Sequence, residues 1–376
     1  MDIYSTHYLS GVVNSLITPS LFLLDRFFPN QVQAEAETIH FDVIDKTRRL
    51  APFVSPMVAG KVMQEKGYST LSFKPAYIKI KTPLEPSTMF KRTPGEPIGS
   101  STPTDPAQPA WNASFNKTLS PLQKQQYRLN AILMDQFDTI TRRLEWMAAQ
   151  ALLSGTVTVS GEQYQTSHLD FGRHPDHTIT LPDYRQWSEP DANGRMIPKP
   201  GANPLRDLDE WQAMALQRVG ATLADVVMTP DVFSVFKECP AIESRLQRVQ
   251  GDNPTTLQTS SPTAEGGTLM GEVDGYRIWV YASWFIDEDG VEQPMLPPGT
   301  VILTSHELAG TRAFGAILDM EAHTMGIAPG TPIPVPIFAK SWTEDDPSAR
   351  WIMSQCAPLV VPTRVNASVS AQVLPE

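Results

Sequence analysis

The stretch HLDFGRHPDH, at residues 168–177, gathers three imidazoles and two carboxylates within ten positions. Both residue types are ligands of Zn²⁺, so the chemistry that this segment could support is metal-assisted hydrolysis. Its spacing matches no helical or zinc-ribbon motif, and Pro175 favours a turn. A polar loop at the end of a strand is the commoner explanation, and we assign no metal site here.

Other motifs of catalysis are missing from the sequence. Gly60–Lys61 lacks the glycine spacing of a phosphate-binding loop, and GGTLMG at 266–271 lacks that of a dinucleotide site. The run Ser305–Glu307 places serine, histidine and glutamate side by side, which cannot form a hydrogen-bonded relay. Cys239 and Cys356 are expected to be small buried hydrophobes. We therefore predict no catalytic residue and no cofactor, that is, a protein that is not an enzyme.

The composition excludes further classes of protein. The chain has 376 residues, of which 41% are hydrophobic and 19% are charged, as is typical of soluble globular proteins. Its net charge of −11 and its scattered Lys and Arg argue against a protein that grips phosphates. No apolar run approaches the roughly 20 residues that cross a bilayer, and a basic signal-peptide region is missing. We expect no sequence-specific DNA binding and no membrane contact.

The clearest predicted element is a helix from about 121 to 153. Ser120 is a suitable N-cap, Pro121 fits the first helical position, and Gln123 completes a capping box. Apolar residues then recur at steps of three and four, which gives the helix one apolar stripe. At 1.5 Å per residue its length would be about 50 Å, more than a compact enzyme domain usually needs. We expect a spine that packs through Leu129, Ile132, Leu133, Phe137, Ile140 and Leu144.

A second predicted element is an extended ribbon at residues 67–86. Apolar and polar residues mostly alternate in STLSFKPAYIKIK, the pattern of a strand with one apolar face. Pro75 and Pro83 cannot donate to a ladder, so the ribbon should occupy an edge or a two-stranded sheet. Such a strand is useful when a neighbouring subunit covers it. The apolar stretch LFLLDRFFP at 21–29 can anchor through Phe22, Phe27 and Phe28 against a core or a neighbouring subunit. Together with this stretch, the ribbon predicts inter-subunit contacts through Phe27, Phe28, Leu71, Phe73, Tyr77, Ile78 and Ile80.

Two later stretches predict strands. IDEDGVE at 286–292 contains the Asp289–Gly290 pair that is typical of a tight hairpin. ARWIMSQCAPLVVP at 349–362 predicts a final strand with a buried face. Because helical and strand patterns are interspersed along the chain, we assign the fold class α+β.

Several pieces of the chain are similar to one known family and follow in the same order as in that family. They are PSLFLLDRFFP at 19–29, APFVSPMVAGKVMQEKGYSTLSFKPAYIKIKTPLEP at 51–86, the spine helix with its tail LLSGTVTVSGEQY at 152–164, LDFGR at 169–173 and DPSARWIMSQCAPLVVP at 346–362. The sequence resembles the major capsid proteins of lambda-like tailed bacteriophages, the capsid protein E family, with the Hong Kong 97-type capsid fold.

The resemblance implies a division of the chain. The implied parts are an N-terminal arm at 1–50, an extended loop at 51–100 that lies over a neighbouring subunit, a peripheral domain with the spine helix at 101–204, an axial domain at 205–344, and a C-terminal strand at 345–376 that returns to the peripheral domain.

The resemblance also implies an assembly. Copies of the chain would form hexamers and pentamers of an icosahedral shell that encloses double-stranded DNA, built in the host bacterial cytoplasm. A separate scaffolding protein, a portal and a trimeric decoration protein are the implied partners. The acidic balance would keep the wall of the shell from trapping packaged DNA.

Two alternatives stay open from the sequence. An encapsulin-like compartment has the same fold but encloses an enzyme, and genes for a terminase, portal and scaffold nearby would argue against it. A metal-dependent hydrolase would use His168, His174 and His177, and the purified protein would contain stoichiometric zinc.

Overall fold

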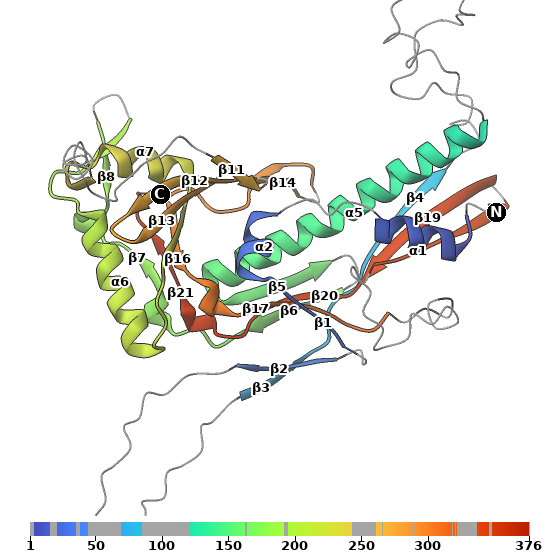
Figure 1. Cartoon of the computed structure of the whole chain (residues 1–376), viewed down its shortest axis with the longest axis horizontal. Helices are drawn as coiled ribbons and strands as arrows, with labels where there is room; N and C mark the ends of the chain where they lie inside the picture. Colours follow the sequence, from blue (N-terminus) through green and yellow to red (C-terminus); the bar gives the residue numbers. More distant parts are fainter. Residues whose placement is uncertain are drawn as a thin grey trace, which may run out of the picture. The chain divides into compact units, whose positions relative to one another are not determined.

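The computed structural model divides the chain into two compact units (Figure 1). The first unit comprises residues 1–18, 77–141 and 316–357, and the second comprises residues 19–76, 142–315 and 358–376. The structure describes residues 4–15, 21–34, 38–43, 69–84, 121–161, 164–191, 195–242, 261–264, 266–287, 289–317, 319, 321, 337–345 and 348–375.

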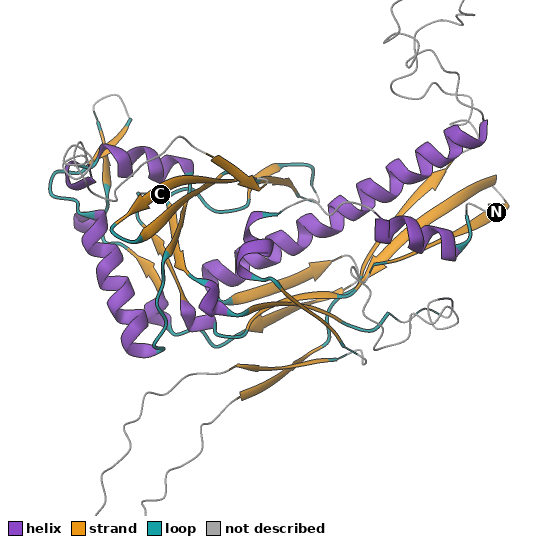
Figure 2. Cartoon of the chain, in the orientation of Figure 1, coloured by secondary structure: helices purple, strands orange, loops and turns teal. Residues whose placement is uncertain are grey.

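The first unit combines helices with a three-stranded antiparallel sheet (Figure 2). Its elements are α1 (Thr6–Ser15), β4 (Ile78–Leu84), α5 (Pro121–Ser154) up to residue 141, β18 (Phe338–Asp345) and β19 (Ser348–Cys356). The strand order is β18-β19-β4, so β4 is an edge strand. One face of this sheet and the two helices share a core that includes Leu9, Phe137 and Ile352.

Helix α5 begins at the predicted residue and ends one residue later than predicted, at Ser154. Gly155 follows it with a φ of +70°, which glycine adopts without strain. A Cβ at this position would also lie 2.5 Å from the Cβ of Arg173. On the predicted stripe, Leu129, Leu133, Phe137, Ile140 and Leu144 are buried and Ile132 is partly buried.

The predicted ribbon forms two strands with different partners. β3 (Ser69–Phe73) pairs with β2 (Ile39–Val43) in a two-stranded sheet, whereas β4 pairs with β19. The structure thus confirms the edge and two-stranded positions that the prolines predicted. Most of the predicted extended loop, at 51–68 and 85–100, lies outside the described residues.

A seven-stranded mixed sheet is the largest sheet of the second unit. Its order is β11-β12-β13-β10-β16-β21-β7, and its inner strands β10 and β16 are buried along their whole length. The seven strands are β7 (Thr178–Thr180), β10 (Asp225–Met228), β11 (Ser261–Ala264), β12 (Gly267–Val273), β13 (Tyr276–Tyr281), β16 (Thr300–Thr304) and β21 (Ser368–Gln372).

Among the described residues, smaller sheets, three further helices and the end of α5 complete the second unit. The helices are α2 (Phe22–Phe27), α6 (Pro204–Arg218) and α7 (Pro230–Glu238). The small sheets contain β1 (Asn30–Gln33), β17 (Gly310–Phe314) and β20 (Pro358–Pro362), then β5 (Thr156–Gly161) with β6 (Tyr164–Asp170), β8 (Ser188–Pro190) with β9 (Met196–Pro198), and β14 (Trp284–Ile286) with β15 (Glu292–Pro294). Short 3₁₀ turns lie at Pro175–His177, Asp183–Arg185, His306–Leu308 and Val365–Ala367.

The described residues of the second unit form two hydrophobic cores. One packs α6 and α7 against the seven-stranded sheet and contains Trp187, Trp211 and Phe236. The other packs α2 and the C-terminal end of α5 with β5, β6, β17 and β20. Within the described part of the chain, no helix combines the length and the apolar character that crossing a membrane requires.

The C-terminal segment differs from the single strand that we expected. It forms three strands: β19 in the first unit, β20 beside β17, and β21 between β16 and β7. Pro358 opens β20 and cannot donate a backbone hydrogen bond, which favours a break after Cys356. The predicted hairpin at IDEDGVE is confirmed, because β14 pairs with β15 across Gly290.

A buried glutamine joins α5 to the sheet of the first unit. Gln136 Nε2 donates to Thr82 Oγ1 at 2.9 Å and to the Ile352 carbonyl oxygen at 3.1 Å. Its Oε1 accepts from Ser354 Oγ at 2.7 Å. Because Gln136 and Ser354 are almost completely buried, neither side chain can exchange these bonds for water.

Replacing Gln136 with leucine should lower the free energy of unfolding by about 1–3 kcal/mol, because buried polar groups lose their partner. Urea unfolding of the purified subunit measures this change. In a Ser354→Ala background the same replacement should cost less, since one of those groups is already gone. Equal costs in both backgrounds would show that the two side chains do not interact.

Candidate functional site

The second unit holds the segment 21–34, which we call the docking arm, through several kinds of contact. The arm consists of α2 followed by β1, and Phe22, Phe27 and Phe28 on it are buried. The Phe22 ring centroid lies 5.1 Å from that of Trp279 and 5.6 Å from that of Tyr281. Burying each such ring contributes roughly 1.5–3 kcal/mol.

The burial of these rings corrects our sequence prediction. We predicted that Phe27 and Phe28 contact a neighbouring subunit, and this is wrong, because both lie in the core of their own subunit. Phe73, predicted at the same kind of contact, is buried in that core as well. An apolar segment indicates that its side chains will be buried, but not by which chain.

Two glycines make room for the arm. A Cβ on Gly267 of β12 would overlap the ring of Phe22, and a Cβ on Gly310 of β17 would overlap the carbonyl oxygen of Phe27 and the ring of Phe28. Neither glycine is needed for a turn, since both lie within strands. Their role is to let the arm approach the backbone closely.

A buried carboxylate on α5 caps the arm helix. Glu145 accepts hydrogen bonds from the backbone N–H groups of Leu23 and Leu24 and from the hydroxyl of Tyr281, each at 2.9 Å. The first N–H groups of a helix have no partner within it, so this carboxylate satisfies two of them. Burial raises the pKa of Glu145 to about 7. The three hydrogen bonds lower this pKa, and the nearby charge of Asp25 raises it, but burial has the largest effect.

A second buried carboxylate holds the arm by charge. Asp225 of β10 accepts from Arg26 Nη2 at 2.7 Å, from Arg277 Nη2 at 2.9 Å and from the indole nitrogen of Trp279 at 3.0 Å. The guanidinium of Arg26 also lies 4.2 Å from the centroid of the Trp279 ring. Removing Arg26 would therefore take one cation away from a carboxylate that is shut off from water.

The end of the arm continues as a strand. β1 pairs in parallel with β17, from Asn30 opposite Thr311 to Gln33 opposite Phe314. Arg312 donates from Nε to the Phe28 carbonyl oxygen at 2.7 Å and from Nη2 to Asp25 at 2.6 Å. Aromatic packing, a capped helix, two ion pairs and a strand pairing thus fix the arm in one position, and none of these contacts is a catalytic arrangement.

The other residues that we predicted at inter-subunit contacts lie on or beside the ribbon. Ile78 and Ile80 pack, partly buried, against the core of the first unit. Tyr77 is half-buried and donates its hydroxyl to the Ala316 carbonyl oxygen at 2.7 Å. Leu71 lies in β3, and its side chain is outside the described residues.

The histidines of HLDFGRHPDH have separate partners. His168 is exposed and contacts Thr158 Oγ1 at 3.0 Å. His174 accepts from the Asp176 backbone N–H at 3.2 Å, and buried His177 contacts the Ser368 carbonyl oxygen at 3.1 Å. Among the residues described, no three His, Cys, Asp or Glu side chains converge as metal ligands would.

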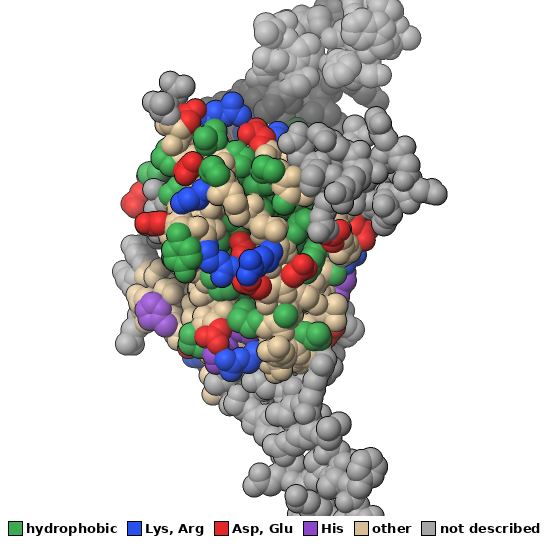
Figure 3. Space-filling model, turned by 90° about the vertical axis from the view of Figure 1, so that its left-hand side faces the viewer, with side chains coloured by type: hydrophobic (Ala, Val, Ile, Leu, Met, Phe, Trp, Pro, Cys, Tyr) green, Lys and Arg blue, Asp and Glu red, His purple; other side chains and the backbone are tan. Residues whose placement is uncertain are grey.

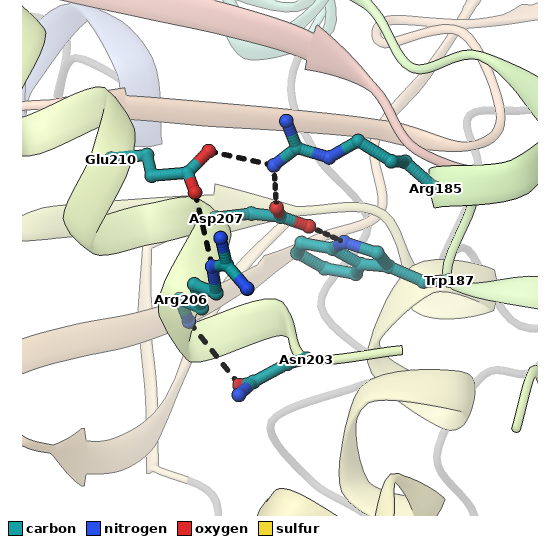
Figure 4. Close-up of polar contacts among 6 residues, drawn as sticks. All are labelled: Arg185, Trp187, Asn203, Arg206, Asp207 and Glu210. Carbon is teal, nitrogen blue, oxygen red and sulfur yellow. Dashed lines mark hydrogen bonds and ion pairs between the residues drawn. The ribbon is translucent and has the colours of Figure 1, made fainter. Parts of the chain in front are cut away.

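A polar network ties the loop before β8 to α6 (Figure 4). Arg185 pairs with Asp207 and with Glu210, and Asp207 also accepts from the Trp187 indole nitrogen at 2.8 Å. Asn203 caps α6 by accepting from the Arg206 N–H at 3.2 Å.

On the face shown in Figure 3, Lys and Arg side chains are mixed with Asp, Glu and hydrophobic side chains, without a continuous basic field.

Sequence reasoning missed the residues that hold the arm. Glu145 has a weak signal in the sequence, because it follows Leu144 of the stripe and precedes the apolar run MAAQALL, where a helix is expected to be buried. Asp225 lies beside the apolar run VVM, which also hints at a buried carboxylate. Gly267 and Gly310 become meaningful only when the arm is seen against the strands.

The sequence matches the family model for the phage major capsid protein E over residues 5–373. It is 27% identical to the major capsid protein of Escherichia phage lambda, in an alignment that covers 99% of this chain and 100% of that protein. It is also 27% identical to the P21 prophage-derived major head protein of Escherichia coli O6:H1 strain CFT073, with the same coverage.

The fold is similar to that of a solved structure. The crystal structure of a prophage capsid protein from E. coli CFT073 aligns with a TM-score of 0.69 at 22% sequence identity, covering 98% of both chains. At this identity the likeness concerns the fold, and it extends to nearly the whole chain.

The raised pKa of Glu145 predicts how stability depends on pH. Because the folded-state pKa of about 7 lies above the usual 4.5, the stabilising contribution is fully present below pH 4.5 and is lost as pH rises through 7. The difference amounts to roughly 3 kcal/mol. Glu145→Gln should remove this pH dependence, although its amide nitrogen cannot accept a backbone N–H bond and it should be less stable at low pH.

Thermal unfolding of both proteins between pH 4.5 and 8 measures the effect. Asp135→Asn, on the exposed side of α5, serves as the control and should follow the wild-type curve. If the curves of the wild type and Glu145→Gln run parallel, the carboxylate does not titrate in this range.

Proposed function

The chain belongs to the phage major capsid protein E family, and we propose that its copies join through exposed surfaces while the docking arm stays within its own subunit. As a member of this family the chain is a major capsid protein, not an enzyme, and copies of it form the icosahedral shell of a tailed phage. The observation that carries this function is the family match over residues 5–373, which includes the arm, α5 and every described sheet.

The proposed contents of the shell are consistent with the charge of the chain. Double-stranded DNA repels a wall with a net charge of −11 per subunit, so the genome can be packed against it without being bound. A protein that held DNA in place would need clustered cations instead. We expect no sequence-specific binding of DNA by the assembled shell.

The proposed partners other than the chain itself follow from the family resemblance. They are a separate scaffolding protein, a portal and a trimeric decoration protein, and the proposed place of assembly is the cytoplasm of the host bacterium. The proposed division into arm, extended loop, peripheral domain and axial domain has the same basis. The hydrolase alternative lacks support, because its three histidines form hydrogen bonds with three different partners and, among the described residues, do not converge with other metal-ligand side chains.

The extended loop is the part of the chain to which we assign the main contact between subunits. The first part of the loop, residues 51–68, and the end of the N-terminal arm, residues 44–50, together join β2 to β3, and Val43 lies opposite Ser69 in that pair of strands. A two-residue turn can therefore replace the whole segment without changing the strand register.

Replacing residues 44–68 with Asn-Gly should give a folded subunit that forms no closed shells. Its melting temperature should stay within about 4 °C of the wild-type value, because the replaced segment joins two strands that can still pair. Electron microscopy and sedimentation of the purified protein measure assembly. A Gly/Ser segment of the original length is the control for chain length and should also fail to assemble. Normal shells from either variant would contradict the role of the loop.

A further inference from the structure

A hairpin of the second unit carries an exposed apolar surface. β14 and β15 form a two-stranded sheet of their own, labelled β14 in Figure 1. Phe285 packs against a core, whereas Trp284, Ile286 and Val291 are 59%, 66% and 52% exposed. We call these three residues, with the acidic residues Asp289 and Glu292, the hairpin surface. Apolar side chains of this size gathered on one hairpin mark a protein contact rather than ordinary surface.

The charge of the hairpin surface restricts its partner. Asp287, Asp289 and Glu292 are exposed or half-buried, and residues 284–294 contain no Lys or Arg. Asp287 accepts from the N–H groups of Asp289 at 3.0 Å and Val291 at 2.9 Å, so it fixes the turn. A carboxylate-rich tip repels nucleic acid, and it favours a protein surface that offers both cations and aromatic rings.

The sheet of the first unit has a face with that chemistry. The strand pairing places Lys81 beside Met353, and Pro83 beside Trp351 and then Trp342. Side chains at alternate positions, such as Ile80 and Ile352, point to the core, so these residues occupy the other face. We call Lys79, Lys81, Trp342, Trp351 and Met353 the lysine face.

The positive charge of the lysine face comes from two residues. The ammonium group of Lys81 lies 5.0 Å from the Trp351 ring centroid, and that of Lys79 lies 5.3 Å from the Tyr77 ring centroid; both lysines are exposed. Lys340 is paired with Asp319 at 2.5 Å. Glu344, at the far end of the face, accepts from the Trp351 indole nitrogen at 2.6 Å. Within the described part of the chain no carboxylate forms an ion pair with Lys79 or Lys81, so both can meet a carboxylate of another copy.

We propose that the hairpin surface of one copy docks on the lysine face of a second copy of this chain. This inference rests on the proposed function, in which many copies share one shell. Carboxylates of the tip would meet Lys79 and Lys81, while Trp284, Ile286 and Val291 would cover Trp351 and Met353. Because two different surfaces meet, the contact is heterologous, and repeating it around an axis can close a ring.

Charge reversal on the full-length chain tests the proposal. One variant combines Lys79→Glu with Lys81→Glu, and the other combines Asp289→Lys with Glu292→Lys and leaves the turn-fixing Asp287 in place. Each should reduce the yield of closed shells at least about tenfold, since like charges then face each other. All four substitutions together should restore the yield to within about threefold of wild type, because opposite charges face each other again.

Lys237→Glu, on an exposed position of α7, is the matched control and should assemble normally. Melting curves of all variants check the fold. Little change in melting temperature is expected, because the side chains of Lys79, Lys81, Asp289 and Glu292 are all exposed. As a second measurement, Val291→Cys and Lys81→Cys in two differently tagged copies should be joined by a short bismaleimide only after assembly. Native Cys239 and Cys356 are buried and should not react.

The outcomes separate this inference from the proposed function. If the wild type forms no shells under any condition, the proposed function fails. If the wild type forms shells and both charge-reversed variants do so equally well, the docking contact is wrong while the function stands. If each reversal blocks assembly but the combination does not restore it, or if assembled copies carrying Val291→Cys and Lys81→Cys form no cross-link, the pairing of these two surfaces is overturned.

Discussion

The buried carboxylate of Glu145 is the interaction on which the arrangement of the second unit depends. It joins three parts of the chain that are far apart in sequence, because α5 supplies the carboxylate, the arm supplies two N–H groups and β13 supplies the Tyr281 hydroxyl. A buried polar group is tolerated only with such partners, and departure of the arm would take two of the three hydrogen bonds away from Glu145. The rings of Phe22 and Phe28 can enter only because Gly267 and Gly310 lack a Cβ. The arm is therefore part of the subunit and not a free tether.

This constraint determines which surfaces are left for assembly. Buried residues such as Phe27, Phe28 and Phe73 stabilise one copy, whereas a shell needs side chains that one copy leaves exposed. Exposed apolar groups occur on the β14–β15 hairpin, and an aromatic face with lysines occurs on the sheet of the first unit. The chain thus combines a tightly packed interior with surfaces that a second copy can cover. The family match is the evidence that copies of the chain assemble, and the chemistry of these surfaces indicates how two copies can contact each other.

Local patterns predicted the local elements well. The cap at Ser120 and the stripe from Leu129 to Leu144 gave α5 to within one residue, and Asp289–Gly290 gave the hairpin. Features that depend on partners far away in the sequence were not predictable. We assigned Phe27 and Phe28 of the arm to a contact between subunits, because hydrophobicity does not say which chain buries a ring. The C-terminal segment became three strands because β20 and β21 pair with strands from elsewhere in the chain. Glu145 had only a weak signal in the apolar run around it, and the two glycines had none.

The most direct test of this account is electron microscopy of the purified full-length protein, expressed alone and together with its neighbouring genes. The account predicts closed icosahedral particles or their ring-shaped capsomers, made of many copies of this chain, and their diameter would give the copy number. A monomer or a small discrete oligomer under every condition would contradict it, because a subunit of this family that never forms a shell would have another function.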